Sequence, residues 1–268
     1  MSILDGCTAL ITGASSGFGA EFARQLAPRA KTLILAARRR DRLESLAAEL
    51  ARPGLAIRCL SVDLADAVDT ERFFRALDAL PEKIDFLINN AGLGDHGLFE
   101  NSEWSRVEAM IDVNVTALTR VTHGLLPGLV KQGRGAILNV SSIASLLPLP
   151  QMAVYAATKA YVTSLSEALR SELRGTGVSV TALCPGPVDT EFFEIAERAN
   201  SDGNQMAPTL FKVSAEEVVS AGLQAVEDDR ARVIPGWIVF LTMTLTTLLP
   251  FFIVRFFLNQ RGREYRGH

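Results

Sequence analysis

Three side chains near the middle of the chain stand at spacings that suit proton transfer to an oxygen atom. Tyr155 and Lys159 are four residues apart, so on a helix their side chains lie on one face, and Ser142 precedes them. A lysine charge close to a phenol favours the phenolate and lowers a pKa that is about 10 when unperturbed. We expect such a tyrosine to pass a proton to or from an alcohol oxygen near neutral pH.

A glycine-rich segment follows the first apolar run of the chain. Residues 7–11 are short, apolar and partly β-branched, which predicts a buried parallel strand, and residues 20–27 have the pattern of a helix. Between them stand Gly13, Gly17 and Gly19, with the spacing G-x-x-x-G-x-G. Glycine permits the tight turn and lets the backbone approach a pyrophosphate at the N-terminus of the helix. The strand, turn and helix together predict a dinucleotide site.

The end of the second predicted strand indicates the type of dinucleotide. Residues 32–36 are apolar, and Arg38, Arg39 and Arg40 follow before the first acid, Asp41. An acid at the end of this strand commonly binds the ribose 2′-hydroxyl of NAD, whereas arginine accommodates a 2′-phosphate. The sequence therefore favours NADP(H), with Arg38 as the leading phosphate contact and Arg39 as the second. The alternative interpretation is that these arginines only begin a solvated helix.

These segments resemble the short-chain dehydrogenase/reductase family, and the resemblance covers roughly residues 4 to 190. It rests on motifs that follow one another in the family's order. They are residues 12–19, Val62-Asp63-Leu64, Asn89-Asn90-Ala91-Gly92, Asn114, Ser142 with Tyr155 and Lys159, and Pro185-Gly186-Pro187-Val188 with Thr190. The resemblance implies an oxidoreductase that uses a nicotinamide dinucleotide.

The resemblance also implies four catalytic residues. Tyr155 would be the general acid for ketone reduction or the base for alcohol oxidation, and Lys159 would lower its pKa and bind the nicotinamide ribose. Ser142 would hydrogen-bond the substrate oxygen and stabilise the charge that builds there. Asn114 would hold a water that links Lys159 to solvent. Ser141 is a rival for Ser142, but the family's spacing to the tyrosine selects Ser142.

The cofactor contacts are implied in the same way, with Asp63 on the adenine side and Thr190 with the Val188 backbone orienting the carboxamide. The expected positions are Gly13, Ser15, Ser16, Gly17, Phe18, Gly19, Arg38, Arg39, Asp63, Leu64, Asn90, Ala91, Gly92, Tyr155, Lys159, Pro185, Gly186, Val188 and Thr190. Many relatives that use NADP have a basic residue just before the second glycine of the turn. This chain has Ser15 and Ser16 there, so the NADP preference rests on the arginines after the second strand.

The composition suits one α/β domain. The chain has 268 residues, 48% of them hydrophobic, and a net charge of −3, which does not indicate nucleic-acid binding. Alternating strand and helix patterns predict a Rossmann-like, doubly wound parallel sheet of about seven strands with helices on both faces. We expect strands at 7–11, 32–36, 57–62, 85–89, 135–141, 178–184 and 231–234. We expect helices at 18–28, 41–51, 68–80, 103–131, 151–173 and 215–228, the last opened by a capping box at Ser214 and Glu217.

Cysteine and histidine placement argues against a disulfide framework and a metal site. Cys7, Cys59 and Cys184 are far apart in apolar segments, which favours buried thiols in a reducing cytosol. His96 and His123 lack metal-ligand spacing with other His, Cys or acidic residues, so we expect no metal. The first residues show no charged-then-apolar signal pattern. The sequence therefore predicts a cytoplasmic protein.

We expect residues 1–236 to form the dinucleotide-binding catalytic domain. Residues 191–212 lack clean periodicity and follow the nicotinamide-side Pro-Gly, which predicts a mobile lid over the substrate. Five apolar residues could line a substrate pocket by their position: Leu93, Leu146, Leu147, Leu149 and Met206.

Residues 237–268 form an apolar C-terminal segment, since no residue from 233 to 254 is charged. Three interpretations stay open. Residues 237–258 could pack on their own subunit or across a dimer, or lie in the cytoplasmic leaflet of a membrane, where Pro250 would break a straight helix. A true crossing would put Arg261, Arg263 and Arg266 outside the cell, against the positive-inside tendency.

The sequence thus predicts an NADP(H)-dependent oxidoreductase that interconverts a carbonyl and an alcohol on an apolar or lipid-like substrate. The alternative is a membrane-associated, nucleotide-binding regulator or scaffold without turnover. The resemblance implies a homodimer or homotetramer, paired through the helices at 103–131 and 151–173. We expect a cytoplasmic enzyme, on the inner face of a membrane if residues 237–258 attach to one.

Overall fold

The computed structural model describes residues 2–188, 191, 196 and 213–264, with the backbone alone at 261, 263 and 264. The strands are β1 (Thr8–Thr12), β2 (Thr32–Ala37), β3 (Ala56–Ser61), β4 (Phe86–Asn89), β5 (Gly135–Val140), β6 (Val178–Leu183) and β7 (Arg232–Val233). The α-helices are α1 (Gly17–Leu26), α2 (Arg40–Leu50), α3 (Ala67–Asp78), α4 (Trp104–Ile111), α5 (Leu118–Gln132), α6 (Ala153–Glu172), α8 (Ala215–Glu227), α9 (Trp237–Leu248) and α10 (Phe251–Glu264). Shorter elements are η1 (Phe99–Asn101), η2 (Asp112–Ala117) and η3 (Ile143–Ser145).

The strands form one parallel sheet with the order β3-β2-β1-β4-β5-β6-β7. The predicted Rossmann-like, doubly wound fold is confirmed. The order reverses between β1 and β4, so the chain winds away from these two neighbours in opposite directions. A crevice therefore opens between their carboxyl ends, which is where such sheets bind ligands.

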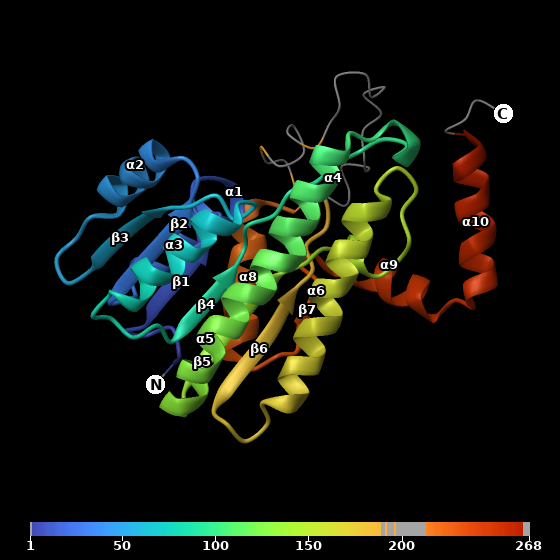
Figure 1. Ribbon diagram of the computed structural model, residues 1–268. Helices are drawn as coiled ribbons and strands as arrows, with labels where there is room; N and C mark the ends of the chain where they lie inside the picture. Colours follow the sequence, from blue (N-terminus) through green and yellow to red (C-terminus); the bar gives the residue numbers. More distant parts are fainter. Residues whose placement is uncertain (1, 189–190, 192–195, 197–212, 265–268) are drawn as a thin grey trace.

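Alternate side chains of the central strands enter two apolar layers. On one face, Ile11 and Leu33 pack with side chains of α1, α2 and α8. On the other face, Leu10 and Ile34 pack with side chains of α3, α5 and α6. Figure 1 shows helices covering the sheet on both sides. β1 and β2 are buried at every residue, which explains why these central strands are so apolar.

Most element boundaries lie within two residues of the expected positions, and the capping box is confirmed. The Ser214 hydroxyl accepts the Glu217 N–H at 3.1 Å, and the Glu217 carboxylate accepts the Ser214 N–H at 3.2 Å. One expectation is wrong: the single helix at 103–131 is interrupted by the π-helix η2 between α4 and α5. The apolar pattern continues through this turn, so the sequence does not reveal it.

The chain after β7 forms two apolar helices, α9 and α10, joined at Leu249 and Pro250. In the part of the chain that the structure describes, no single helix is long and apolar enough to cross a bilayer. Trp237–Leu248 and Phe251–Gln260 meet the length and hydropathy criteria only as a pair, which is bent by 111°. Figure 1 shows α10 standing apart from the sheet and its covering helices.

The turn between β1 and α1 depends on two glycines. Gly13 has a φ of +67°, and a Cβ at this position would lie 2.8 Å from the Cα of Ala91. A Cβ on Gly19 would lie 2.2 Å from the carbonyl oxygen of Gly13, well inside any normal contact. The first turn of α1 can therefore lie against the turn only when residue 19 has no side chain.

We expect Gly19→Ala to lower the thermal unfolding midpoint by about 5–10 °C, since overpacking of this kind costs ~1–3 kcal/mol. The variant should also lose nucleotide binding, because the added methyl group pushes α1 away from Gly13. Differential scanning fluorimetry with and without nucleotide measures both effects.

The matched control is Gly128→Ala. Gly128 lies on the exposed side of α5, and a Cβ there meets no described atom within 4 Å. Alanine favours a helix over glycine by about 0.5–1 kcal/mol, so this variant should keep or raise the midpoint. Equal stability and nucleotide binding in the two variants would contradict the steric argument.

Candidate active site

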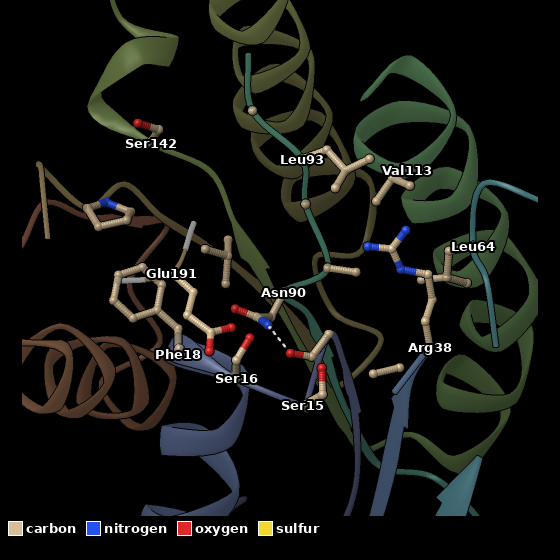
Figure 2. A pocket seen from close by; sticks show the side chains of 18 of the residues that line it. Ser15, Ser16, Phe18, Arg38, Leu64, Asn90, Leu93, Val113, Ser142 and Glu191 are labelled. Carbon is tan, nitrogen blue, oxygen red and sulfur yellow. Dashed lines mark hydrogen bonds between the residues drawn. The ribbon is translucent and has the colours of Figure 1, made fainter. Parts of the chain in front are cut away.

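Most of the expected site residues surround one cavity at the carboxyl edge of the sheet. Its lining includes Gly13, Ser15, Ser16, Gly17, Phe18, Arg38, Arg39, Asp63, Leu64, Asn90, Ala91, Gly92, Ser142, Tyr155, Lys159, Pro185, Gly186 and Val188. Gly19 is buried behind the turn, Asn114 lies behind Leu93, and Thr190 is outside the described residues. Figure 2 shows Arg38 and Leu64 on one side of this cavity and Ser142 on another.

Hydrogen bonds fasten the glycine turn to the loop after β4. The Thr12 hydroxyl accepts the N–H groups of Asn90 at 3.0 Å and Ala91 at 3.1 Å. In return, the Asn90 side-chain amide donates to the carbonyl oxygens of Thr12 at 2.9 Å and Gly13 at 3.2 Å. Because Thr12 is buried, these bonds are made without competition from water. They set the separation of the two loops that flank the cavity.

Ser142 lies at the end of β5 and is hydrogen-bonded to the hydroxyl of Tyr155 on α6. The Ala144 N–H donates to the Ser142 hydroxyl oxygen at 3.1 Å, so the serine can direct its own proton toward the phenol or a substrate. Ser141 faces the other way, and its hydroxyl donates to the Lys159 carbonyl oxygen at 2.9 Å. The geometry therefore favours Ser142 over Ser141 as the serine of the site.

Burial dominates the pKa of Tyr155. Loss of water raises it to about 12, although the hydrogen bond from Ser142 lowers it by a smaller amount. The Lys159 ammonium lies 5.8 Å from the centroid of the phenol ring. The expectation of a lowered tyrosine pKa is wrong for this structure, because desolvation disfavours the phenolate more than its neighbours favour it.

Burial acts on Lys159 in the opposite direction and lowers its pKa from 10.5 to about 8. The side chain is only 4% exposed, and its ammonium donates to the Val140 carbonyl oxygen at 2.9 Å. An ammonium that has lost its water releases its proton more readily. At neutral pH the site therefore holds a protonated phenol beside a lysine that is mostly charged.

Asn114 sits in the π-helix η2 and holds the loop after β4. Its side-chain oxygen accepts the Leu93 N–H at 2.8 Å, and its amide donates to the Leu93 carbonyl oxygen at 2.9 Å and to Thr158 at 3.0 Å. Gly92 lies between Asn114 and Lys159, since a Cβ there would be 3.4 Å from a polar atom of each. A π-turn often marks a functional position. This one places the Asn114 side chain next to Gly92, whose other neighbour is the Lys159 ammonium.

Arg39 links the glycine turn to an acid far along the chain. Its guanidinium donates to the hydroxyls of Ser15 at 3.3 Å and Ser16 at 2.7 Å, and to the Glu191 carboxylate at 3.2 Å. Arg42 donates to the same carboxylate at 2.7 Å. The Arg42 and Arg39 guanidiniums hold the pKa of Glu191 below its usual range. Sequence reasoning missed Arg42 and Glu191, because no local pattern connects residues so far apart.

The expected substrate wall is present in part. Leu93 lines the cavity, and Leu149 packs with Leu93 against the apolar cluster that contains Tyr155. Leu146 and Leu147 are half-buried but do not line the cavity among the described residues. Met206 and almost all of the lid expected at 191–212 lie outside the described residues.

Comparisons with known proteins agree with this arrangement. A family model described as short chain dehydrogenase matches residues 7–201. The chain is 46% identical over 222 residues to a sulfoacetaldehyde reductase of Chromohalobacter salexigens, covering 78% of this chain and 83% of that protein.

Two solved structures have a similar fold. A short-chain dehydrogenase from Sphingobium yanoikuyae in complex with NADPH has a TM-score of 0.79 at 33% identity, covering 91% of this chain and 96% of that one. A short chain dehydrogenase/reductase from Burkholderia phymatum in complex with NAD has a TM-score of 0.79 at 29% identity, covering 91% and 94%. These two structures hold different dinucleotides, so they leave the cofactor preference of this chain open.

We expect the Lys159 side chain to titrate with a midpoint near pH 8, because burial lowers its pKa to about 8. The ¹³C shift of its ε-carbon, followed by NMR across pH 6 to 11 in lysine-labelled protein, measures the midpoint. A Lys159→Met variant, which removes this one signal, assigns it. A midpoint above about pH 10, the ordinary lysine range, would contradict the burial of the ammonium.

Proposed function

The chain belongs to the short-chain dehydrogenase family and is an NAD(P)-dependent oxidoreductase that interconverts an alcohol and a carbonyl; from that premise we propose that it uses NADP(H), with Tyr155 as general acid and base. One observation carries the proposal. Ser142, Tyr155 and Lys159 line the same cavity as the glycine turn and the arginines that follow β2. We propose carbonyl reduction as the physiological direction, since NADPH is a hydride donor.

In this reaction Tyr155 donates its hydroxyl proton to the carbonyl oxygen during reduction and withdraws it during oxidation. Ser142 donates a hydrogen bond to the same oxygen and stabilises the charge that develops there. The nicotinamide ring, when bound, supplies or accepts the hydride. The Lys159 charge favours loss of the phenol proton at the moment of transfer. A phenol with a pKa of about 12 is protonated at neutral pH, which suits proton donation.

We also propose that a water held near Asn114 connects Lys159 to solvent. In support, Asn114 and Lys159 flank the same position beside Gly92. Such a path would return a proton to the tyrosine after each reduction.

The residues around the glycine turn fit a dinucleotide. Gly19 lies so close to Gly13 that it could not carry a side chain here, and a Cβ on Gly13 would meet the backbone of Ala91. This side of the cavity is therefore lined by backbone, which a pyrophosphate can approach closely. Ser16 is the N-cap of α1 but its side chain does not cap the helix within the described structure, so the first N–H groups are available to a pyrophosphate. Pro185, Gly186 and Val188 would hold the nicotinamide end.

The arginines support NADP(H) over NAD(H). Arg38 lines the cavity beside Leu64 and makes no ion pair with any described residue, so its charge is available to a 2′-phosphate (Figure 2). Arg39 places a second guanidinium on Ser15 and Ser16. Many relatives that use NADP have a basic residue at this point of the turn, and Arg39 would supply the charge that this chain lacks there. Arg39 and Arg42 already bind one anionic group, the Glu191 carboxylate.

We propose an apolar substrate, because the described wall beside Tyr155 is apolar. Met110, Ala144 and Ala156 pack with Tyr155, and Leu93 lies against this cluster. The name of the Chromohalobacter relative indicates a small, sulfonated aldehyde. A panel of carbonyl compounds that runs from short charged aldehydes to long-chain ketones therefore distinguishes the two substrate classes.

We propose that two or four copies of the chain assemble in the cytoplasm through α4, α5 and α6. Apolar side chains are exposed on this face, among them Trp104 of α4 and Tyr161 of α6. A shallow apolar groove between Ile111 and Val154 lies on the same face. Burial of such a surface between copies would remove it from water.

Tyr155→Phe should keep NADPH binding and lower turnover by about 10²–10⁴-fold, since general acid–base groups contribute that much. The substitution removes the hydroxyl and leaves the buried ring in place. Steady-state rates and NADPH fluorescence titration measure the two properties. Turnover equal to that of the unaltered protein would rule out Tyr155 as the acid, and would reopen the alternative of a scaffold without turnover.

Arg38→Ala should raise the KM for NADPH by about 10- to 100-fold and leave the KM for NADH nearly unchanged, because a charge-assisted contact of ~1.5–3 kcal/mol is lost. Arg40→Ala is the matched control, since Arg40 is an exposed neighbour that pairs with Glu44 and does not line the cavity. A preference of the unaltered enzyme for NADH would contradict the assignment.

A further inference from the structure

Helices α9 and α10 carry most of the exposed large apolar side chains in the described part of the chain. The most exposed are Trp237, Leu248 and Phe252, at 76%, 75% and 72%. Val239 and Val254 are the buried side chains of the pair. A surface of this size in water needs an apolar covering.

The exposed side chains of α10 surround most of the helix. Residues on a helix follow one another at about 100°. Phe251, Phe252, Phe256 and Phe257 therefore cover an arc of roughly 240° around the helix axis. These four phenylalanines are exposed, and Val254 faces the remaining side. Arg255 is also exposed and lies among these phenylalanines, with its guanidinium 5.2 Å from the centroid of the Phe251 ring. A contact with a second copy of the chain would cover one side of α10, whereas lipid can contact the phenylalanines on each exposed side while the Arg255 side chain extends to the headgroups.

Two of the four threonine hydroxyls of α9 are hydrogen-bonded within the helix, which makes them compatible with an apolar medium. The Thr246 hydroxyl donates to the Thr242 carbonyl oxygen at 2.7 Å, and the Thr247 hydroxyl donates to the Thr244 carbonyl oxygen at 2.9 Å. These donors are therefore satisfied inside the helix and need no water. No residue from 233 to 254 is charged.

The charge changes sign at the end of the pair. Residues 255–268 contain four arginines and one acid, a net charge of +3 (4 − 1), whereas the whole chain has −3. The cations follow the apolar stretch directly, as in segments that meet anionic headgroups. Trp237 stands at the other end, and tryptophan is enriched at the interface between lipid and water.

We propose that α9 and α10 dock on a lipid bilayer that carries anionic headgroups, with the bend at Leu249 and Pro250 entering one leaflet. The 12 residues of α9 span about 18 Å and the 14 of α10 about 21 Å, against a hydrocarbon core of ~30 Å. The bend of 111° keeps the two helices from forming one straight span. This docking does not depend on which cofactor or substrate the enzyme uses.

Docking would also place the membrane near the cavity. β7 is parallel to the other strands, so its carboxyl end lies at the edge of the sheet where the cavity opens. Only three residues separate Val233, the last residue of β7, from Trp237, the first of α9. Figure 1 shows α9 extending from the end of β7, with α10 beyond it. An apolar carbonyl compound dissolved in the bilayer would then have a short route to Tyr155.

Flotation of the full-length protein with vesicles tests the proposal. The vesicles are phosphatidylcholine alone, or phosphatidylcholine mixed with phosphatidylserine. We expect about tenfold more protein to float with the mixed vesicles, because the arginines add attraction to the apolar contact. No flotation with either lipid would overturn the proposal.

A double variant, Leu248→Asp with Phe252→Asp, locates the contact. Both side chains are exposed, so the fold, the thermal midpoint and NADPH binding should be unchanged while flotation falls about tenfold or more. The matched control is Val68→Asp, the same kind of change at a 61% exposed position of α3. Equal flotation of the double variant and the control would overturn the proposal.

Tryptophan fluorescence and light scattering separate lipid from a second copy as the occupant. In a Trp104→Phe protein only Trp237 emits, and its emission should shift to shorter wavelength when mixed vesicles are added. Light scattering should give the same subunit number for the double variant and the unaltered protein. A dimer that becomes monomeric in the double variant, without vesicle binding by either protein, would show a subunit interface instead.

Discussion

The hydrogen bonds between Thr12 and Asn90 fix the distance across which the site is built. They join the carboxyl ends of β1 and β4, the neighbouring strands from which the chain winds in opposite directions. Two residues beyond Asn90, Gly92 brings the backbone close to Lys159, and the next residue is held by Asn114. One short run of backbone therefore connects the glycine turn with the buried ammonium. The side chains that could do chemistry are placed by strand ends and main-chain contacts.

Burial then moves apart the pKa values of two groups, Tyr155 and Lys159, that titrate at nearly the same pH in water. An exposed tyrosine and an exposed lysine have nearly the same pKa, about 10, whereas here the phenol rises to about 12 and the ammonium falls to about 8. As the pH rises, Lys159 thus loses its proton before Tyr155 does. The cavity favours the uncharged form of each group, so a charged intermediate oxygen nearby must be stabilised by directed hydrogen bonds such as that of Ser142.

Local patterns in the sequence predict the fold, whereas the resemblance to the family predicts most of the residues that line the cavity. Buried parallel strands give continuous apolar runs, and the glycines, Asn90, Tyr155 and Lys159 each stand at a strand end or on one helix face. Three features needed coordinates. The π-turn at Asn114 leaves the apolar pattern intact, the direction of the Tyr155 shift depends on how much water is excluded, and the approach of Glu191 to Arg39 joins residues 152 positions apart.

Glu191 supplies the arginines at the cavity with a counter-ion from the chain itself. Its carboxylate lies 2.7 Å from Arg42 and 3.2 Å from Arg39. In the proposed complex with NADP(H), a 2′-phosphate at Arg39 would compete with this carboxylate, and the free energy gained would be the difference between two ion pairs. A phosphate monoester carries close to two negative charges at neutral pH and a carboxylate one, so charge favours the phosphate. Shape matters as well, since a tetrahedral group and a flat one meet the planar guanidinium donors differently.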